Sequence, residues 1–165
     1  MNLYNLHSNP ESLFGYKEAT ERVPAVAWEA HEDDHDKLRE LEHIWAQSAK
    51  YSYYYAAHII KERFPKGEDA IATDQGFSFA YAKDVMNGRF PQGEPEIARH
   101  PESYWYALVV LGDRFPEGEP AIATDAEYSY EYAKNVLEKR FPLGEPTIRG
   151  SEWQSKYENY FGIKL

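Results

Sequence analysis

The sequence contains no cysteine among its 165 residues. Disulfide frameworks, thiolate metal sites and cysteine nucleophiles are therefore excluded. No stretch approaches the roughly 18 consecutive apolar residues of a membrane-spanning helix, and the first residues lack the basic and apolar regions of a signal peptide. We therefore expect a cytoplasmic protein that does not enter a membrane.

Basic residues are scarcer than acidic ones, 18 against 28, which gives a formal net charge of -10. This excess of acid disfavours direct binding to nucleic acid or to an anionic membrane surface. Hydrophobic residues make up 42% of the chain and aromatic residues 16%, a composition typical of a folded protein rather than a disordered one. The length favours a single domain over residues 1–165.

A six-residue motif, Arg-Phe-Pro-x-Gly-Glu, occurs four times at intervals of 26, 25 and 26 residues. The four copies begin at Arg63, Arg89, Arg114 and Arg140. Each copy follows a Tyr-Ala pair by eight residues and precedes an isoleucine in a matching place. The isoleucines are Ile71, Ile97, Ile122 and Ile148. The repeating unit is therefore one long element, a turn and one short element.

The long element of the fourth repeat has the periodicity of a helix. At 100° per residue, its apolar and aromatic side chains, among them Tyr128, Tyr132 and Val136, cover an arc of roughly 220°. A helix with one buried side needs an arc of only about 100°, so this helix should lie between neighbours. The pattern predicts an all-α fold, a short solenoid of two-helix repeats of 25–26 residues with degenerate terminal caps. We expect long helices near residues 48–63, 74–89, 100–114 and 125–140.

Residues at the ends of each element support this assignment. The expected N-caps of the long helices are Ser48, Asp74, His100 and Asp125, and Pro101 suits the first helical position. Phe-Pro should stop each long helix, and the turn glycines should supply positive φ angles. These glycines are Gly67, Gly93, Gly118 and Gly144. Glu-Pro begins the short helix in three repeats, and Asp69 replaces the proline in the first.

Partial repeats flank the four complete ones. Residues 42–48 align with residues 119–125, which makes 23–46 a plausible degenerate repeat, and residues 151–161 begin a further helix. We divide the chain into an acidic N-terminal cap with a degenerate repeat over 1–47, four repeats over 48–150 and a C-terminal cap helix over 151–165. Each motif arginine is expected to brace its repeat by pairing with a turn carboxylate or a carbonyl.

The repeat consensus, Tyr-Ala-x-x-Val-x-x-x-Arg-Phe-Pro-x-Gly-Glu-Pro-x-Ile-Ala, resembles tandem-repeat proteins encoded by bacteriophages and some large DNA viruses. Residues 81–98 and 132–148 show it most clearly. The resemblance covers residues 48–150 strongly and residues 22–47 weakly. It implies a virus-encoded protein acting in a host cytoplasm, and it implies no particular reaction or cofactor.

One short motif points to metal chemistry. His31, Glu32 and His35 match His-Glu-x-x-His, in which two histidines one helical turn apart bind zinc and the glutamate activates water. Asp33 and Asp34 lie between the histidines, and such anions favour a solvated helix face over a buried zinc site. We therefore expect no metal and no cofactor, and keep a zinc hydrolase as an alternative.

An acidic patch lies in the same region. Its members are Glu29, Glu32, Asp33, Asp34, Asp36 and Glu40. Acidic helical proteins can imitate the phosphate spacing of a duplex and occupy a basic nucleic-acid groove. Ordinary solubility explains such a patch equally well, so nucleic-acid mimicry stays an alternative.

The third repeat differs from the others on its expected outer face. Trp105, Leu108 and Val109 stand where the second and fourth repeats hold mostly charged, polar or small residues, and Tyr54 and His58 of the first repeat partly share this apolar character. Either a partner or the non-repeat N-terminus should cover such a patch. We predict that these five residues bind a protein partner or a second copy of the chain.

The sequence therefore favours a non-enzymatic protein-interaction module. The viral resemblance suggests an accessory protein that binds a host factor, which would include a defence factor, and inhibits or redirects it. Nucleic-acid mimicry and zinc hydrolysis are the alternatives.

Overall fold

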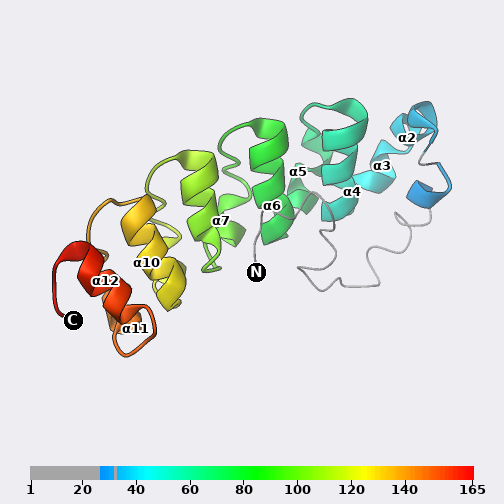
Figure 1. Ribbon diagram of the computed structural model, residues 1–165. Helices are drawn as coiled ribbons and strands as arrows, with labels where there is room; N and C mark the ends of the chain where they lie inside the picture. The colour runs from blue at the N-terminus through cyan, green and yellow to red at the C-terminus, as the bar shows by residue number, and fades with distance from the viewer. Residues whose placement is uncertain (1–26, 32) are drawn as a thin grey trace. The chain divides into compact units, whose positions relative to one another are not determined.

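The computed structural model describes residues 27–31 and 33–165 (Figure 1). Within these ranges every regular element is a helix, which confirms the predicted all-α class. The chain forms two compact units, Met1–Glu96 and Ile97–Leu165, and each is described by itself. Residues 1–26 of the expected N-terminal cap lie outside the described residues.

The first unit holds the degenerate repeat and the first two complete repeats. The degenerate repeat contributes α2 (His35–Glu40) and α3 (Glu42–Trp45). The first complete repeat contributes α4 (Ala49–Tyr54), a π-helical continuation η3 (Tyr55–Ile60) and the short helix α5 (Pro65–Ile71). The second contributes α6 (Gln75–Tyr81), η4 (Ala82–Met86) and α7 (Glu94–Ile97), in which the division between the units falls. Helices α4 and α6 lie side by side (Figure 1).

The second unit holds the remaining repeats. Its third repeat contributes α8 (Ser103–Trp105), η5 (Tyr106–Leu111) and α9 (Glu119–Ile122). Its fourth contributes α10 (Ala126–Asn135) and α11 (Glu145–Ile148), and α12 (Gln154–Phe161) follows. The expected long helices are therefore present, and the helix expected over 151–161 begins at Gln154.

The first three long helices end three residues earlier than predicted, and the fourth, α10, ends five residues earlier. Three of them finish in a π-helical turn, and the next residue is left-handed: Lys61 (φ 56°), Asn87 (φ 48°) and Gly112 (φ 60°). In the fourth repeat Glu138 (φ 51°) holds the same place. This turn, and not the Phe-Pro pair, stops the helix.

The turn glycines do not supply positive φ angles, so that prediction is wrong. Gly118 and Gly144 both have φ of -88°. Their role is close packing, because a Cβ on Gly144 would lie 2.6 Å from the Cβ of Ser129 in α10. The same crowding by a serine of the long helix occurs at Gly67, Gly93 and Gly118. Glycine is needed because the short element lies directly against the long helix.

Three of the four predicted N-caps are confirmed. The side chains of Ser48, Asp74 and Asp125 accept hydrogen bonds from backbone N–H groups three residues later. The prediction for His100 is wrong, because α8 begins only at Ser103 and Pro101 lies in the preceding turn. Each short helix begins at its Glu-Pro pair except α5, which begins at Pro65. Proline has no N–H for the carbonyl four residues earlier, whereas Asp69 has one, so the first repeat gains a longer helix.

The core of each unit is built from the repeated apolar residues. In the first unit Trp45, Tyr55, Ile71 and Tyr81 are completely buried. In the second unit the tyrosines and isoleucines of the repeat are completely buried as well. They are Tyr106, Tyr132, Tyr157, Ile122 and Ile148.

Candidate interaction surface

Within each unit, a hydrogen-bonded bracket connects a motif turn to the long helix of the next repeat. In the second unit, Arg114 donates two hydrogen bonds of 2.9 Å to the carboxylate of Glu119. The Tyr132 hydroxyl donates to Glu119 at 2.9 Å and accepts the backbone N–H of Phe115 at 3.0 Å. We call this set of an arginine, a glutamate, a tyrosine and a backbone N–H the bracket. It satisfies a buried donor and a partly buried carboxylate together.

The bracket recurs in both units. Arg63 and Glu68 form it with Tyr81 in the first unit, and Arg140 and Glu145 form it with Tyr157 in the second. Each arginine is paired with a turn carboxylate, which confirms the predicted bracing.

Hydrogen bonds of the bracket type also occur in the two segments that flank the complete repeats. Glu42 accepts from the Tyr55 hydroxyl at 2.9 Å, across the same 13-residue separation as Glu119 and Tyr132, with Lys66 in place of the arginine. Tyr157 completes the bracket of Glu145 at a separation of 12 residues. Glu42 of residues 42–48 and Tyr157 of α12 therefore take part in the same glutamate–tyrosine hydrogen bond as the complete repeats.

The brackets shift the protonation equilibria of their members. Hydrogen bonds from Arg140 lower the pKa of Glu145, and the Tyr157 hydroxyl adds to this effect against the opposing effect of burial. Burial, together with the hydrogen bond to Glu145, raises the pKa of Tyr157 to about 12. The folded protein therefore favours ionised glutamates and neutral tyrosines at these places.

Two residues of the expected outer face, Asp84 and Asn135, each lie against the preceding long helix of their own unit. We refer to Tyr55, Tyr81, Tyr106, Tyr132 and Tyr157 as the core tyrosines. The Tyr53 hydroxyl donates to Asp84 at 2.8 Å, and Asn135 donates to the Tyr104 hydroxyl at 3.0 Å. Asp84 and Asn135 both stand three residues after a core tyrosine, so this position borders the helix of the previous repeat.

Trp105 is half-buried against its own unit. Its ring centroid lies 4.9 Å from that of Tyr104. Its side chain also lies close enough to Tyr128 to oppose the rise in the pKa of that tyrosine caused by burial. Tyr104 in turn lies 5.9 Å from Tyr128, centroid to centroid. The long helix α10 of the next repeat therefore covers part of Trp105, which is a cover that the sequence analysis did not consider.

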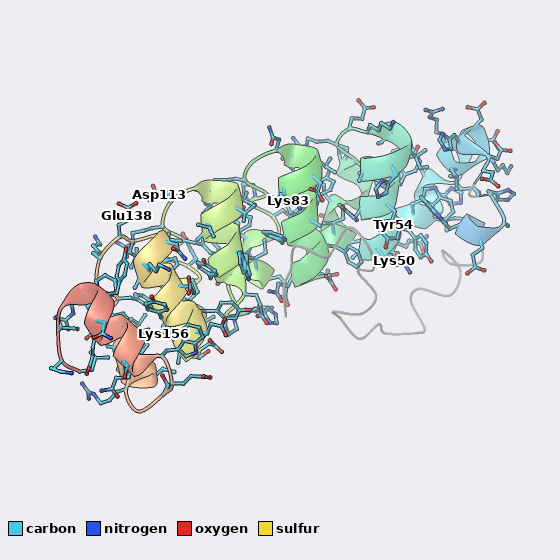
Figure 2. All side chains as sticks on the ribbon, in the orientation of Figure 1. Lys50, Tyr54, Lys83, Asp113, Glu138 and Lys156 are labelled. Atoms are coloured by element: carbon cyan, nitrogen blue, oxygen red, sulfur yellow. The ribbon has the colours of Figure 1, made fainter. Side chains whose placement is uncertain are left out.

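Tyr54 occupies the equivalent position in the first unit, directly before a core tyrosine. Its ring lies 6.3 Å from Phe77 of the next long helix and 6.2 Å from Trp28 of the degenerate repeat, centroid to centroid. Lys50 lies over the same ring at 5.9 Å, and Figure 2 labels both residues on α4. Packing within the unit thus explains the aromatic character of Tyr54. His58 is exposed and contacts the rings of Tyr53 and Tyr54.

Leu108 and Val109 are the predicted surface residues that packing within their unit explains least. Leu108 is half-buried and Val109 is 37% exposed. The equivalent pairs in the second and fourth repeats are Lys83 with Asp84 and Lys134 with Asn135. Leu108 and Val109 therefore occupy positions where two other repeats hold solvent-compatible side chains.

Two lysines beside aromatic rings were not singled out by sequence analysis. The Nζ atom of Lys156 lies 3.7 Å from the centre of the Trp153 ring, and that of Lys134 lies 5.6 Å from the centre of the Tyr130 ring. No repeated pattern marks these residues, because Trp153 belongs to the partial repeat. The only signal in the sequence is a lysine three residues after a tryptophan and another four residues after a tyrosine.

The acidic patch lies at the first turns of the first unit. Asp33, Asp34, Asp36 and Glu40 are exposed, and so is Glu29. Asp34 caps α2, Asp36 pairs with Arg39, and Glu40 pairs with Lys37. Glu32 lies outside the described residues. The solvated face expected for this stretch is consistent with these exposures.

The two histidines of the zinc motif differ in how far they are exposed to solvent. His31 is half-buried and His35, the first residue of α2, is exposed. Over residues 27–31 and 33–165, no three histidine, aspartate or glutamate residues are arranged to hold a metal ion. No helix of the described ranges is long and apolar enough to cross a membrane.

Fold and surface together define an all-α protein built from bracketed tandem repeats. No protein-family model, no curated protein and no solved structure matches the chain.

Proposed function

We propose that the protein is a non-enzymatic protein-interaction module that presents Leu108 and Val109 of η5 to a partner. One observation carries the proposal: two adjacent apolar residues occupy positions where the equivalent repeats hold Lys83 with Asp84 and Lys134 with Asn135. Apolar side chains kept where polar ones fit are typical of the centre of a binding surface.

The arginine, glutamate and tyrosine side chains of the brackets do not support a catalytic role. Each motif arginine donates to the glutamate of its own turn, and in the complete brackets the tyrosine hydroxyl is shared between that glutamate and a backbone N–H. Groups engaged in this way stabilise the fold, and using them in a reaction would break it. The resemblance to viral repeat proteins supports a host factor as the partner, which the protein would bind and inhibit or redirect in the host cytoplasm.

The test replaces the apolar pair by the residues of the fourth repeat. The double variant Leu108→Lys and Val109→Asn should stay folded, as judged by circular dichroism, because two other repeats hold polar or charged residues at both positions. Binding to the partner recovered by affinity capture from the host should weaken at least about tenfold, which corresponds to roughly 1.4 kcal/mol.

A matched control is Leu143→Gln, which removes an equally apolar side chain, 53% exposed, from the turn of the fourth repeat. Gln92 holds the equivalent position in the second repeat. The control should bind like the wild type. Unchanged binding by the double variant would refute the proposed surface.

Exposure of the acidic patch favours one second candidate, a mimic of nucleic acid. Asp33, Asp34 and Asp36 are all exposed, as carboxylates facing a basic groove must be. A partner held in this way should dissociate steeply as salt rises, whereas a partner held by Leu108 and Val109 should not.

A further inference from the structure

The second unit carries a group of cations and aromatic rings that lies beside the bracket tyrosine Tyr157. Trp153 and Tyr130 have ring centroids 5.6 Å apart, and Tyr160, which is 53% exposed, lies 6.4 Å from Tyr130. Lys156 and Lys134 lie over two of these rings. We call these five residues the lysine-aromatic patch. Figure 2 labels its exposed cation, Lys156, on α12.

The two lysines of this patch differ from the ion-paired lysines elsewhere in the described residues. Among the described residues, neither Lys134 nor Lys156 has a carboxylate within ion-pair distance, whereas Lys37, Lys66 and Lys164 each have one. A lysine over an aromatic ring is held in place while its ammonium hydrogens still point to solvent. The patch therefore presents two positioned and uncompensated positive charges on a chain of net charge -10.

The acidic stretch of the chain has the complementary charge. Residues 29–42 contain seven acidic side chains against two basic ones, and Asp33, Asp34 and Asp36 are exposed. Residues 139–165 contain five basic side chains against three acidic ones. Opposite charge at two different places on one chain favours association between unlike surfaces of two copies.

We propose that the lysine-aromatic patch binds the acidic stretch of a second copy of this chain, so that copies associate head to tail. The carboxylates of Asp33, Asp34 and Asp36 would accept hydrogen bonds from Lys134 and Lys156, and Tyr160 would supply apolar contact. This surface is separate from Leu108 and Val109, so the proposal does not rest on the proposed function.

The test compares the oligomeric state of three full-length proteins by sedimentation at about 0.05 M and about 0.5 M salt. The wild type should associate with rising concentration at low salt and dissociate at high salt. A lysine variant, Lys134→Gln with Lys156→Gln, should associate at least about tenfold more weakly. An aspartate variant, Asp33→Asn with Asp34→Asn and Asp36→Asn, should do the same, and its helix α2 keeps a good N-cap because asparagine suits that position as well as aspartate does.

Mixing the two variants is the sharpest measurement. The lysine variant keeps the acidic stretch and the aspartate variant keeps the patch, so a mixture should contain one-to-one dimers at concentrations where each variant alone is monomeric. Only association through two unlike surfaces gives this result.

The charge-matched control is Lys61→Gln with Lys139→Gln, which removes two exposed lysines outside the patch and should associate like the wild type. Circular dichroism confirms that each variant is folded. A wild type that stays monomeric at low salt overturns the proposal. Association that survives the lysine substitutions, or folded variants that fail to dimerise when mixed, overturns it too.

Discussion

The hydroxyl group of each bracket tyrosine satisfies two partners that would otherwise lose a hydrogen bond inside the protein. In the second unit, Tyr132 accepts from the backbone N–H of the buried Phe115 and donates to Glu119. A buried N–H without an acceptor costs about 1–3 kcal/mol. The strict repetition of tyrosine at this position, rather than phenylalanine, follows from this double role.

We predict that Tyr132→Phe lowers the free energy of unfolding by about 1–3 kcal/mol, measured by urea denaturation. The ring packing is kept, so the loss reports the hydroxyl alone. The control is Tyr104→Phe, because Asn135 also donates to Glu131 and keeps a partner. Phe79 holds the equivalent position in the second repeat. Equal losses for the two variants would contradict the role of the bracket.

The sequence predicted the pairing of Arg63 and its equivalents with turn carboxylates, because the same two residue types recur at one spacing. It did not predict the tyrosine as the third member, since a tyrosine within an apolar arc indicates only burial. Trp105 shows the same difficulty: the pattern placed it outside, but a large ring at the edge of the arc reaches Tyr128 of the next helix.

At the scale of the element, a left-handed residue follows each long helix, and in the first three repeats a π-helical turn precedes it. The repeats tolerate lysine, asparagine, glycine and glutamate at this residue, and only glycine adopts the conformation without steric cost. Periodicity located all four long helices but placed their ends too late, because apolar residues continue past the turn. The prediction of positive φ angles at the turn glycines was wrong because glycine is also the residue required where two backbones pack closely, and the sequence does not distinguish the two causes.

We predict that Glu138→Gly raises the free energy of unfolding by about 1 kcal/mol, because glycine relieves the left-handed strain and removes a negative charge from a helix C-terminus. Figure 2 labels this residue beyond α10. Glu138→Gln separates the two causes, since it removes the charge and keeps the strain.

The reverse change at the equivalent position, Gly112→Ala, should destabilise by about 1 kcal/mol. No atom lies within 4 Å of the added Cβ, so this loss reports backbone strain alone. Thermal unfolding measures all three variants. A destabilising Glu138→Gly would show that the left-handed residue does not limit stability.

At the scale of the whole molecule, the brackets set the pH range of stability. The hydrogen bonds of Arg63 and Tyr81 hold the pKa of Glu68 below 4.5 although burial acts against them, and the pKa of Glu145 is lowered in the same sense. Burial raises the pKa of Tyr81 and of Tyr157 from 10.0 to about 12. A lowered carboxyl pKa stabilises above the unfolded value, and a raised tyrosine pKa stabilises below the unfolded value.

We therefore predict a plateau of stability between about pH 5 and pH 9.5. Stability falls below it as the glutamates are protonated, and it falls above about pH 10 as tyrosines ionise in the unfolded chain. The urea midpoint as a function of pH measures both limbs. Tyr157→Phe should flatten the alkaline limb, and an alkaline limb of unchanged slope would exclude Tyr157 as a source.

The all-α class and the repeat boundaries were predictable at this scale because four copies average out local irregularities. The division into two units was not, since the period continues through residue 97 without interruption. The lysine-aromatic patch could not be predicted from the sequence either, because its side chains come from a complete repeat and from the segment that follows it.

The bracket has a consequence for how such a chain changes length during evolution. Within the second unit, one repeat supplies the turn that receives the next tyrosine, and Tyr132 and Tyr157 fulfil the same role in successive helices. A tandem duplication of the gene segment for one repeat adds one new tyrosine for the turn before it and one new turn for the tyrosine after it. Every inserted copy is therefore self-complementary at both joins. Recombination within the gene can lengthen or shorten the array by whole repeats without any compensating mutation.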